Sequence, residues 1–372
     1  MSEPLLEPTL VPMPWEQEEQ DPTPIDRPRT AEPRPAPIPY RTALEVANST
    51  SEQPDWLLHG FIALGAITEV DGKIKSSGKT TLVTHLVAAI LDGQPFLGQP
   101  TMRTNVVYLT EQTAATYREA LGRAGLLARG AELRLVFRGD VAGRPWSELI
   151  AQVAVDAKRD GYGLLVVDTL GKLAGIVNEN DAGEGARAMT SLQDAAHAGM
   201  AVLVCRHDRK GGGEVGESGR GSSAISGDVD VILQLRRSEG NVPKSRRVIE
   251  SLSRYVETPE KIVIELTDEG FTLLGDDEAV TLADAVRFLS ALLHEQFEQK
   301  ESWTTEELVK ETGLTRAAIQ RAVKHMRLRG ERVDEFTDDG GKARKGHPLM
   351  YRLIQEKVSA HTHGLLGQKE TE

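Results

Sequence analysis

The stretch GKIKSSGKTT, residues 72–81, contains the glycines, lysine and threonines of a loop that could bind phosphate. A phosphate-binding loop usually has four residues between its first glycine and its final Gly-Lys-Thr/Ser. Here five residues separate Gly72 from Gly78. Backbone N–H groups of such a loop converge on phosphate oxygens, and the N-terminus of the next helix adds partial positive charge. We therefore predict a nucleotide site formed by Gly72, Lys73, Ser76, Ser77, Gly78, Lys79, Thr80 and Thr81.

Two residues of this loop have specific predicted roles. Lys79 is expected to reach the β- and γ-phosphates, and Thr80 to offer its hydroxyl to Mg²⁺, which needs few protein ligands. The extra residue either forms a bulge before Gly78 or leaves Lys73 in the place of the first glycine. A glycine turn ahead of an ordinary helix is the alternative. The strand-like run before the loop and the helical pattern after it favour the phosphate site.

Two acidic residues end apolar, strand-like runs. Asp168 ends the run in LLVVDTL (164–170) and is expected to accept hydrogen bonds from the water shell of the metal. Glu111 ends VVYLTE and is expected to orient and deprotonate the attacking water. Either residue could instead cap a helix or lie in solvent. Together with the phosphate loop, they predict nucleoside triphosphate hydrolysis.

These residues require a sheet that brings them together. The predicted strands are 65–70, 105–111, 133–139, 164–170 and 201–207, and the predicted helices are 79–93, 113–127, 145–160 and 183–199. This alternation predicts an α/β fold with a mainly parallel sheet covered on both faces. After residue 228, four short β-like runs follow with no room for helices between them. We expect them to form antiparallel hairpins that extend the sheet.

Six segments together resemble the RecA-like ATPases, in the branch of the plasmid RepA-type hexameric helicases. They are residues 72–81, 92–100, 106–112, 164–170, 202–213 and 220–237. The resemblance implies a RecA-like P-loop core that works as a ring, with ATP bound between subunits of a homo-oligomer. It implies that Lys79, Thr80 and Asp168 hold Mg²⁺-ATP and that Glu111 is the catalytic carboxylate.

His207 ends the run AVLVCRH and precedes a glycine-rich segment. The resemblance implies that His207 senses the γ-phosphate and that this segment faces a central channel, where Arg209 and Lys210 would contact single-stranded DNA. A solvated histidine at the end of a strand is the alternative. Arg220 is our candidate for the arginine that reaches a neighbour's γ-phosphate, because a planar, permanently charged group stabilises transition-state charge. Arg206 and Arg209 are competing candidates.

The C-terminal segment has the pattern of a winged helix-turn-helix domain. Helical spacing over residues 282–297 and a helix-turn-helix pattern over 304–330 precede two β-like arms. A recognition helix beginning near Thr315 would place basic residues in the major groove of duplex DNA, with further basic residues on the wing beside phosphates. A protein-contact domain is the alternative. The predicted DNA contacts are Arg316, Arg321, Lys324, Arg327, Lys342, Arg344 and Lys345.

Composition sets the outer limits of these predictions. The 372-residue chain has a net charge of −12, one cysteine and no apolar run long enough to span a membrane, which favours a globular cytoplasmic protein over a secreted one. Residues 1–40 hold 11 of the 18 prolines, which predicts a disordered tail that is either inert or binds a partner. The predicted units are a tail (1–44), an ATPase domain (45–278), a winged helix domain (279–355) and a flexible tail (356–372).

Three functions fit these features. We favour an ATP-hydrolysing motor or switch that acts on nucleic acid, similar to plasmid or phage replicative helicases. The first alternative is an ATP-responsive DNA-binding regulator or loader with slow turnover. The second is a small-molecule kinase, which would have no use for a winged helix domain.

Overall fold

A computed structural model describes residues 38–74, 77–178, 181–207, 215, 223–238, 242–295, 300–337 and 348–354. The chain divides into two units, Met1–Glu52 and Gln53–Glu372. In the first unit, helix α1 (Ala43–Ser49) begins with a capping box between Thr42 and Glu45. Most of the predicted disordered tail (1–44) and the whole predicted C-terminal tail (356–372) lie outside the described residues.

A nine-stranded sheet forms the centre of the second unit, in the order β11-β10-β9-β8-β3-β7-β6-β4-β5. Strands β3 to β8 pair in parallel, whereas β8 to β11 pair in antiparallel fashion. The α/β prediction with a mainly parallel sheet is therefore confirmed. The strands are β3 (Ile67–Asp71), β4 (Asn105–Thr110), β5 (Leu133–Phe137), β6 (Tyr162–Asp168), β7 (Ala201–Cys205), β8 (Val231–Arg237), β9 (Arg246–Ser253), β10 (Lys261–Thr267) and β11 (Gly270–Asp276).

The four late strands form antiparallel hairpins that extend the sheet, as expected, because β8, β9, β10 and β11 pair antiparallel in that order. β8 also joins this part to the parallel part, since it pairs in parallel with β3, with Thr68 opposite Val231. Its run is almost wholly buried, as expected for a strand inside a parallel sheet and not at its edge. Only its second neighbour, β9, is antiparallel.

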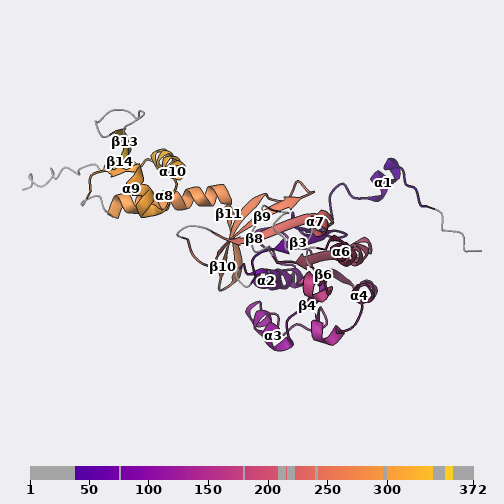
Figure 1. Cartoon of the computed structure of the whole chain (residues 1–372). Coiled ribbons are helices and arrows are strands. Elements are labelled where there is room, and N and C mark those ends of the chain that lie inside the picture. The colour runs from indigo at the N-terminus through magenta and orange to yellow at the C-terminus, as the bar shows by residue number, and fades with distance from the viewer. Residues whose placement is uncertain are drawn as a thin grey trace, which may run out of the picture. The chain divides into compact units, whose positions relative to one another are not determined.

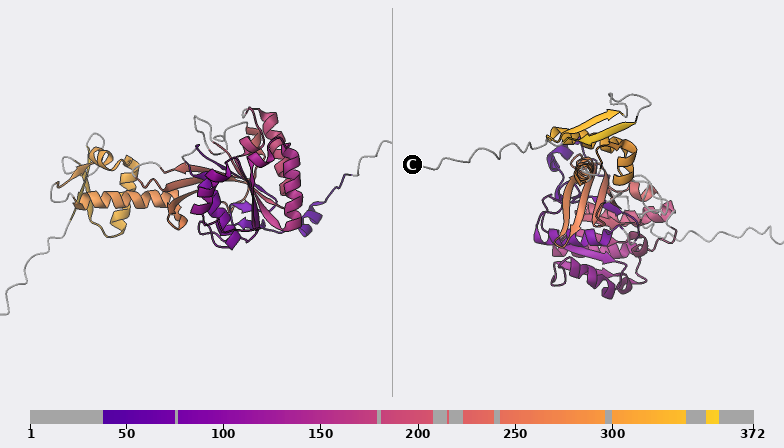
Figure 2. Two further views of the ribbon diagram at one scale, coloured as in Figure 1. Left: turned by 90° about the horizontal axis from the view of Figure 1, so that it is seen from below. Right: turned by 90° about the vertical axis from the view of Figure 1, so that its left-hand side faces the viewer.

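Helices cover both faces of the sheet (Figures 1 and 2). Val106 and Tyr108 of β4 pack with α2 (Lys79–Asp92) and α3 (Ala114–Arg123), whereas the alternate residue Val107 packs with α4 (Trp146–Asp160) and α6 (Ala182–His197). Successive side chains of a strand point to opposite faces, so each parallel strand contributes to both apolar layers. This burial explains why the strands are nearly continuous apolar runs.

Several short elements have no counterpart in the predictions. They span few residues, so no hydrophobic period can be read from them. They are β1 (Trp56–Leu58), β2 (Ile62–Ala63), the 3₁₀ helix η1 (Arg138–Val141), α5 (Leu170–Leu173), α7 (Ser223–Gly227) and β12 (Trp303–Thr304).

The C-terminal part has its own apolar core, which includes Leu289, Ile319 and Tyr351. Thr315 caps the N-terminus of α10, and Gly313 ends α9 in the left-handed conformation. The elements are α8 (Asp277–Glu295), α9 (Thr305–Thr312), α10 (Arg316–Leu328), β13 (Val333–Thr337) and β14 (Leu349–Leu353), with a three-stranded sheet in the order β12-β14-β13. None of the helices in the described ranges is both long and apolar enough to cross a membrane.

Candidate functional site

The phosphate loop and the predicted site residues Glu111, Asp168 and His207 lie at the carboxyl ends of neighbouring parallel strands. Parallel pairing aligns the carboxyl ends of β3, β7, β6 and β4, with Val70 opposite Cys205 and Thr110 opposite Asp168. The phosphate loop follows β3, His207 follows β7, and Glu111 follows β4, so all of them lie at the carboxyl-terminal side of the sheet. Ligands of open α/β sheets bind outside the carboxyl ends of the strands.

The phosphate loop depends on close backbone approach at its two glycines. A Cβ on Gly72 would lie 2.7 Å from both the Leu235 carbonyl oxygen and Ser77 Oγ, so a larger residue would not fit. Gly78 has a φ of +92° and is the N-cap of α2. The backbone N–H and the Oγ hydroxyl of Ser77 both donate to the Lys73 carbonyl, which closes a turn within the lengthened loop. Ser76, another of the predicted nucleotide-site residues, lies outside the described residues.

Lys79, Thr80 and Asp168 lie close together at the start of α2. The buried Lys79 Nζ donates to the Gly72 carbonyl at 2.6 Å, and Thr80 Oγ1 donates to Asp168 Oδ2 at 2.8 Å. Because the Thr80 hydroxyl donates its hydrogen bond to Asp168, its oxygen lone pairs can face a cation. Thr81 is the next residue of the helix and is half-buried.

This pair fits Mg²⁺ by its chemistry. Mg²⁺ keeps several waters and is usually held by one or two carboxylates and substrate phosphates. Among the described residues, no group of three or more His, Cys, Asp or Glu could form an all-protein metal site. One hydroxyl and one carboxylate beside a phosphate loop are therefore a donor set suited to Mg²⁺ bound with a nucleotide.

Tyr108 adds a contact that the sequence did not predict. The buried Tyr108 hydroxyl donates to Asp168 Oδ2 at 2.9 Å, the same oxygen that accepts from Thr80. Burial raises the pKa of Asp168, and the hydrogen bonds from Thr80 and Tyr108 oppose that rise by favouring the carboxylate. Tyr108 thus orients the carboxylate that is expected to hold the metal.

We expect Tyr108→Phe to weaken Mg²⁺-dependent nucleotide binding by about 10-fold, because groups that orient a metal ligand typically contribute about 10- to 100-fold to affinity. Titrating Mg²⁺ at a fixed concentration of fluorescent ADP measures this directly. Binding measured in EDTA should change little, since the phosphate loop is intact. Equal weakening with and without Mg²⁺ would contradict the orienting role.

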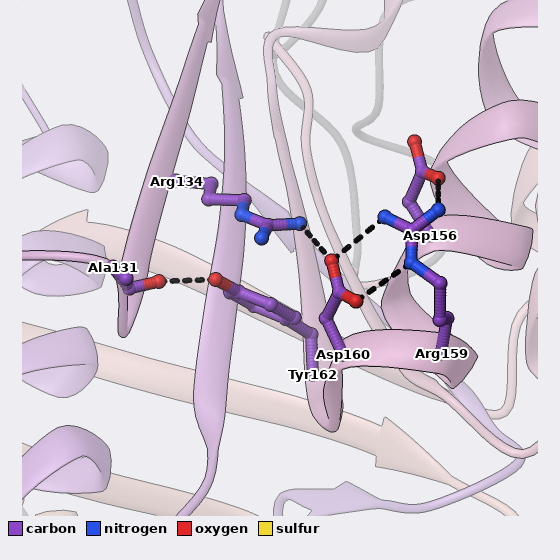
Figure 3. Close-up of polar contacts among 6 residues, drawn as sticks. All are labelled: Ala131, Arg134, Asp156, Arg159, Asp160 and Tyr162. Atoms are coloured by element: carbon purple, nitrogen blue, oxygen red, sulfur yellow. Dashed lines mark hydrogen bonds and ion pairs between the residues drawn. The ribbon is translucent and has the colours of Figure 1, made fainter.

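Tyr162→Phe is the matched control. Tyr162 begins β6, the strand that ends at Asp168, and its hydroxyl donates to the Ala131 carbonyl (Figure 3). Beside it, Asp160 accepts hydrogen bonds from Arg134 at 2.7 Å and from Arg159 Nε at 2.7 Å. The control therefore also removes a partly buried tyrosine hydroxyl, but one that lies at the other end of β6 from Asp168.

Glu111 is held beside Asp168 by two hydrogen bonds. Its backbone N–H donates to the Asp168 carbonyl at 2.9 Å, and Thr169 Oγ1 donates to its Oε2 at 2.9 Å. Glu111 lines a cavity of about 610 Å³ that Phe137, Arg138 and Lys172 also line. A carboxylate that lines an open cavity at the carboxyl ends of the strands can accept a proton from a water molecule in that cavity.

His207 and its neighbour Arg206 have different environments. The half-buried His207 lines a smaller cavity of about 250 Å³ together with Thr169. Arg206 Nη1 donates to both Glu69 carboxylate oxygens, at 2.9 and 2.8 Å, and this pair is buried. Arg206 was a competing candidate for an arginine that reaches a neighbouring subunit, but here it forms a buried ion pair within its own chain.

The predicted nucleic-acid contacts are only partly described. On α10, Arg316, Arg321 and Lys324 are exposed, and Arg316 pairs with Glu306. Arg327 instead donates to the Val333 carbonyl at 2.8 Å and to Glu335 at 3.2 Å, which ties α10 to β13. The remaining predicted contacts, Arg209, Lys210, Lys342, Arg344 and Lys345, lie outside the described residues. Arg220, the candidate for the arginine that reaches a neighbour's γ-phosphate, lies outside them too.

Sequence reasoning missed three side chains that support the site. Tyr108 interrupts an aliphatic strand with a hydroxyl, and Thr169 directly follows Asp168, so both had a weak signal in the sequence. Arg247 of β9 donates from Nε to the Ser77 carbonyl at 2.7 Å, across 170 positions of the chain. No local pattern could have indicated that contact.

Comparisons with known proteins give one family match and a distant structural likeness. Residues 32–213 match a family model described as "AAA domain", a range that includes the phosphate loop, Glu111, Asp168 and His207. No curated protein matches the chain. The chain is similar to a structure described as "Crystal structure of the RadB recombinase", with 18% identity and a TM-score of 0.41, covering 57% of this chain and 91% of that chain. No function is inferred from that structure. The AAA-domain match supports a P-loop ATPase.

Proposed function

We propose that this chain is a Mg²⁺-dependent ATPase that acts as a nucleic-acid-associated motor or switch. The observation that carries the proposal is the grouping of Lys79, the Thr80–Asp168 hydrogen bond and Glu111 at the carboxyl ends of the parallel strands. A phosphate binder alone would need only the loop. A group suited to the metal and a separate carboxylate for the water are the further requirements of hydrolysis.

Each side chain has a distinct role in the proposed reaction. Lys79 would exchange the Gly72 carbonyl for the β- and γ-phosphates, because a buried ammonium group favours an anionic partner. Thr80 and Asp168 would hold the Mg²⁺, which neutralises charge on the phosphates. Glu111, oriented by Thr169, would accept the proton of the attacking water. His207 would detect the γ-phosphate from the end of β7.

The assembly and the DNA contacts form the finer part of the proposal. The resemblance to the RepA-type hexameric helicases suggests a hexameric ring, with ATP between subunits and Arg220 acting on a neighbour's nucleotide. We further propose that residues 279–355 form a winged helix domain that binds duplex DNA. The α8, α9 and α10 helices followed by the β13 and β14 strands support this, because that order matches a helix-turn-helix with a wing.

The exposed face of α10 provides a test of the DNA contact. Arg321→Ala should weaken duplex binding and lower the slope of log affinity against log salt by about 1, because one phosphate contact is lost. Fluorescence anisotropy with labelled duplex at several salt concentrations measures both values. Arg287→Ala, which removes an exposed arginine from α8, is the control and should leave the slope unchanged. Equal slopes for all three proteins would favour a protein-contact domain.

An ATP-responsive regulator or loader is the second candidate. It is favoured by the same cationic face of α10, which suits sequence-specific binding of duplex DNA better than translocation along a single strand. In this case the nucleotide would set the assembly state, and turnover would be slow.

The deciding experiment measures ATP hydrolysis by purified protein, alone and with single-stranded or duplex DNA, together with its mass in solution with and without nucleotide. Lys79→Ala controls for contaminating ATPases. Turnover raised by single strands in a ring-sized assembly would support the motor. Tight ATP binding with negligible turnover and specific duplex binding would support the regulator. An inability to bind nucleotide would contradict both.

A further inference from the structure

Arg247 connects the antiparallel part of the sheet to the phosphate loop. Its Nε donates to the Ser77 carbonyl at 2.7 Å. Its Nη1 donates to the carbonyls of Lys244 and Arg246, at 2.6 and 2.7 Å. Three backbone carbonyls thus fix the half-buried guanidinium in one place, and the planar group can act as a rigid brace.

The alternation of β9 directs this side chain to the loop. The preceding residue, Arg246, contacts Asp284 of α8, and successive side chains of a strand point to opposite faces. Arg237 of β8 lies directly opposite Arg247 in the antiparallel register. Burial and the charge of Arg237 lower the pKa of Arg247. Like charges directly opposite each other in a sheet are destabilising.

The contacted carbonyl lies at the point where the loop becomes a helix. Ser77 precedes Gly78, the left-handed N-cap of α2, which has no side-chain capping hydrogen bond. A Cβ on Gly78 would lie 3.8 Å from Arg247 Nε and 4.0 Å from its Nη2. The first N–H groups of a helix have no partner within it, and this is what makes them available to phosphate.

We propose that Arg247 is a positioning residue for the phosphate loop, holding the Ser77 carbonyl so that the N–H groups of Gly78, Lys79 and Thr80 stay available to the phosphates of a nucleotide. The loop has one residue more than the usual spacing, and a longer loop has more conformations to lose when it binds. The hydrogen bond from Arg247 of β9 to the Ser77 carbonyl restricts those conformations before the nucleotide binds. This inference rests on the proposed function.

The experiment compares ATP and ADP affinities of the wild type, Arg247→Ala and Arg247→Met by competition with a fluorescent nucleotide. Both variants should bind ATP and ADP about 10-fold more weakly, and equally so, because a loop contact acts on both nucleotides alike. Arg247→Met keeps the length of the side chain without its donors, so it serves if the alanine variant does not fold. Arg236→Ala, which removes a neighbouring β8 arginine paired with Glu250, should bind like the wild type.

Hydrogen exchange of the nucleotide-free proteins gives a second readout. Amides of residues 77–80 should exchange faster in the Arg247 variants than in the wild type or Arg236→Ala. Unchanged affinity and exchange in a folded Arg247 variant would overturn the inference. A loss confined to ATP would also overturn it, since that result indicates direct contact with the γ-phosphate. If the wild type bound no nucleotide, the proposed function would fail, and the exchange rates would still test the brace.

Discussion

Glu111→Gln is expected to lower ATP turnover by about 10²- to 10⁴-fold while leaving ATP affinity nearly unchanged. Glutamine has almost the same shape but cannot accept a proton from water. Thr169 can still donate to the amide oxygen in place of Glu111 Oε2, so the end of β4 should keep its position. Single-turnover hydrolysis and nucleotide competition measure the two effects separately.

Glu119→Gln is the control for this variant. Glu119 lies on α3, where its exposed carboxylate pairs with Arg123 at 2.9 Å, so the change removes one carboxylate without touching the site. Its turnover should equal that of the wild type. If Glu111→Gln also turned over normally, the base would have to lie elsewhere, and if it lost ATP binding, Glu111 would have a binding role.

Glu69→Ala is expected to lower the free energy of unfolding by about 3–5 kcal/mol, because it removes the Glu69 carboxylate from its buried ion pair with Arg206. The Glu69 and Arg206 side chains are only 0% and 3% exposed. Arg206 also donates to Ser226 Oγ of α7 at 3.1 Å, so the pair links β3, β7 and α7. Urea unfolding followed by circular dichroism measures the loss.

Two further variants separate the buried charge from other causes of instability. Glu119→Ala breaks an exposed ion pair and should cost at most about 1 kcal/mol. Replacing both partners, Glu69→Leu with Arg206→Met, should recover most of the loss, because buried pairs can be exchanged for apolar residues of similar volume. A loss below about 1 kcal/mol for Glu69→Ala would show that the carboxylate is not needed as a counter-charge.

The sequence by itself determined the type and order of the main elements. The apolar runs became strands because their hydrophobic side chains are buried on both faces, and the alternating helices followed from their periodic faces. The position of Asp168 at the end of β6 and of Glu111 just after β4 also follows from these local patterns. Turn chemistry predicted the break at Gly313 between α9 and α10.

The tertiary structure alone decided which side chains meet. The Glu69–Arg206 and Arg247–Ser77 contacts, which no sequence pattern indicated, join residues 137 and 170 positions apart. Hydrophobic periodicity records which face of an element is buried, but it carries no information about the partner across the sheet. The parallel pairing of β8 with β3 shows the same limit, since the run itself fits either direction. Strand order set these contacts, and strand order emerges only when the whole sheet is packed.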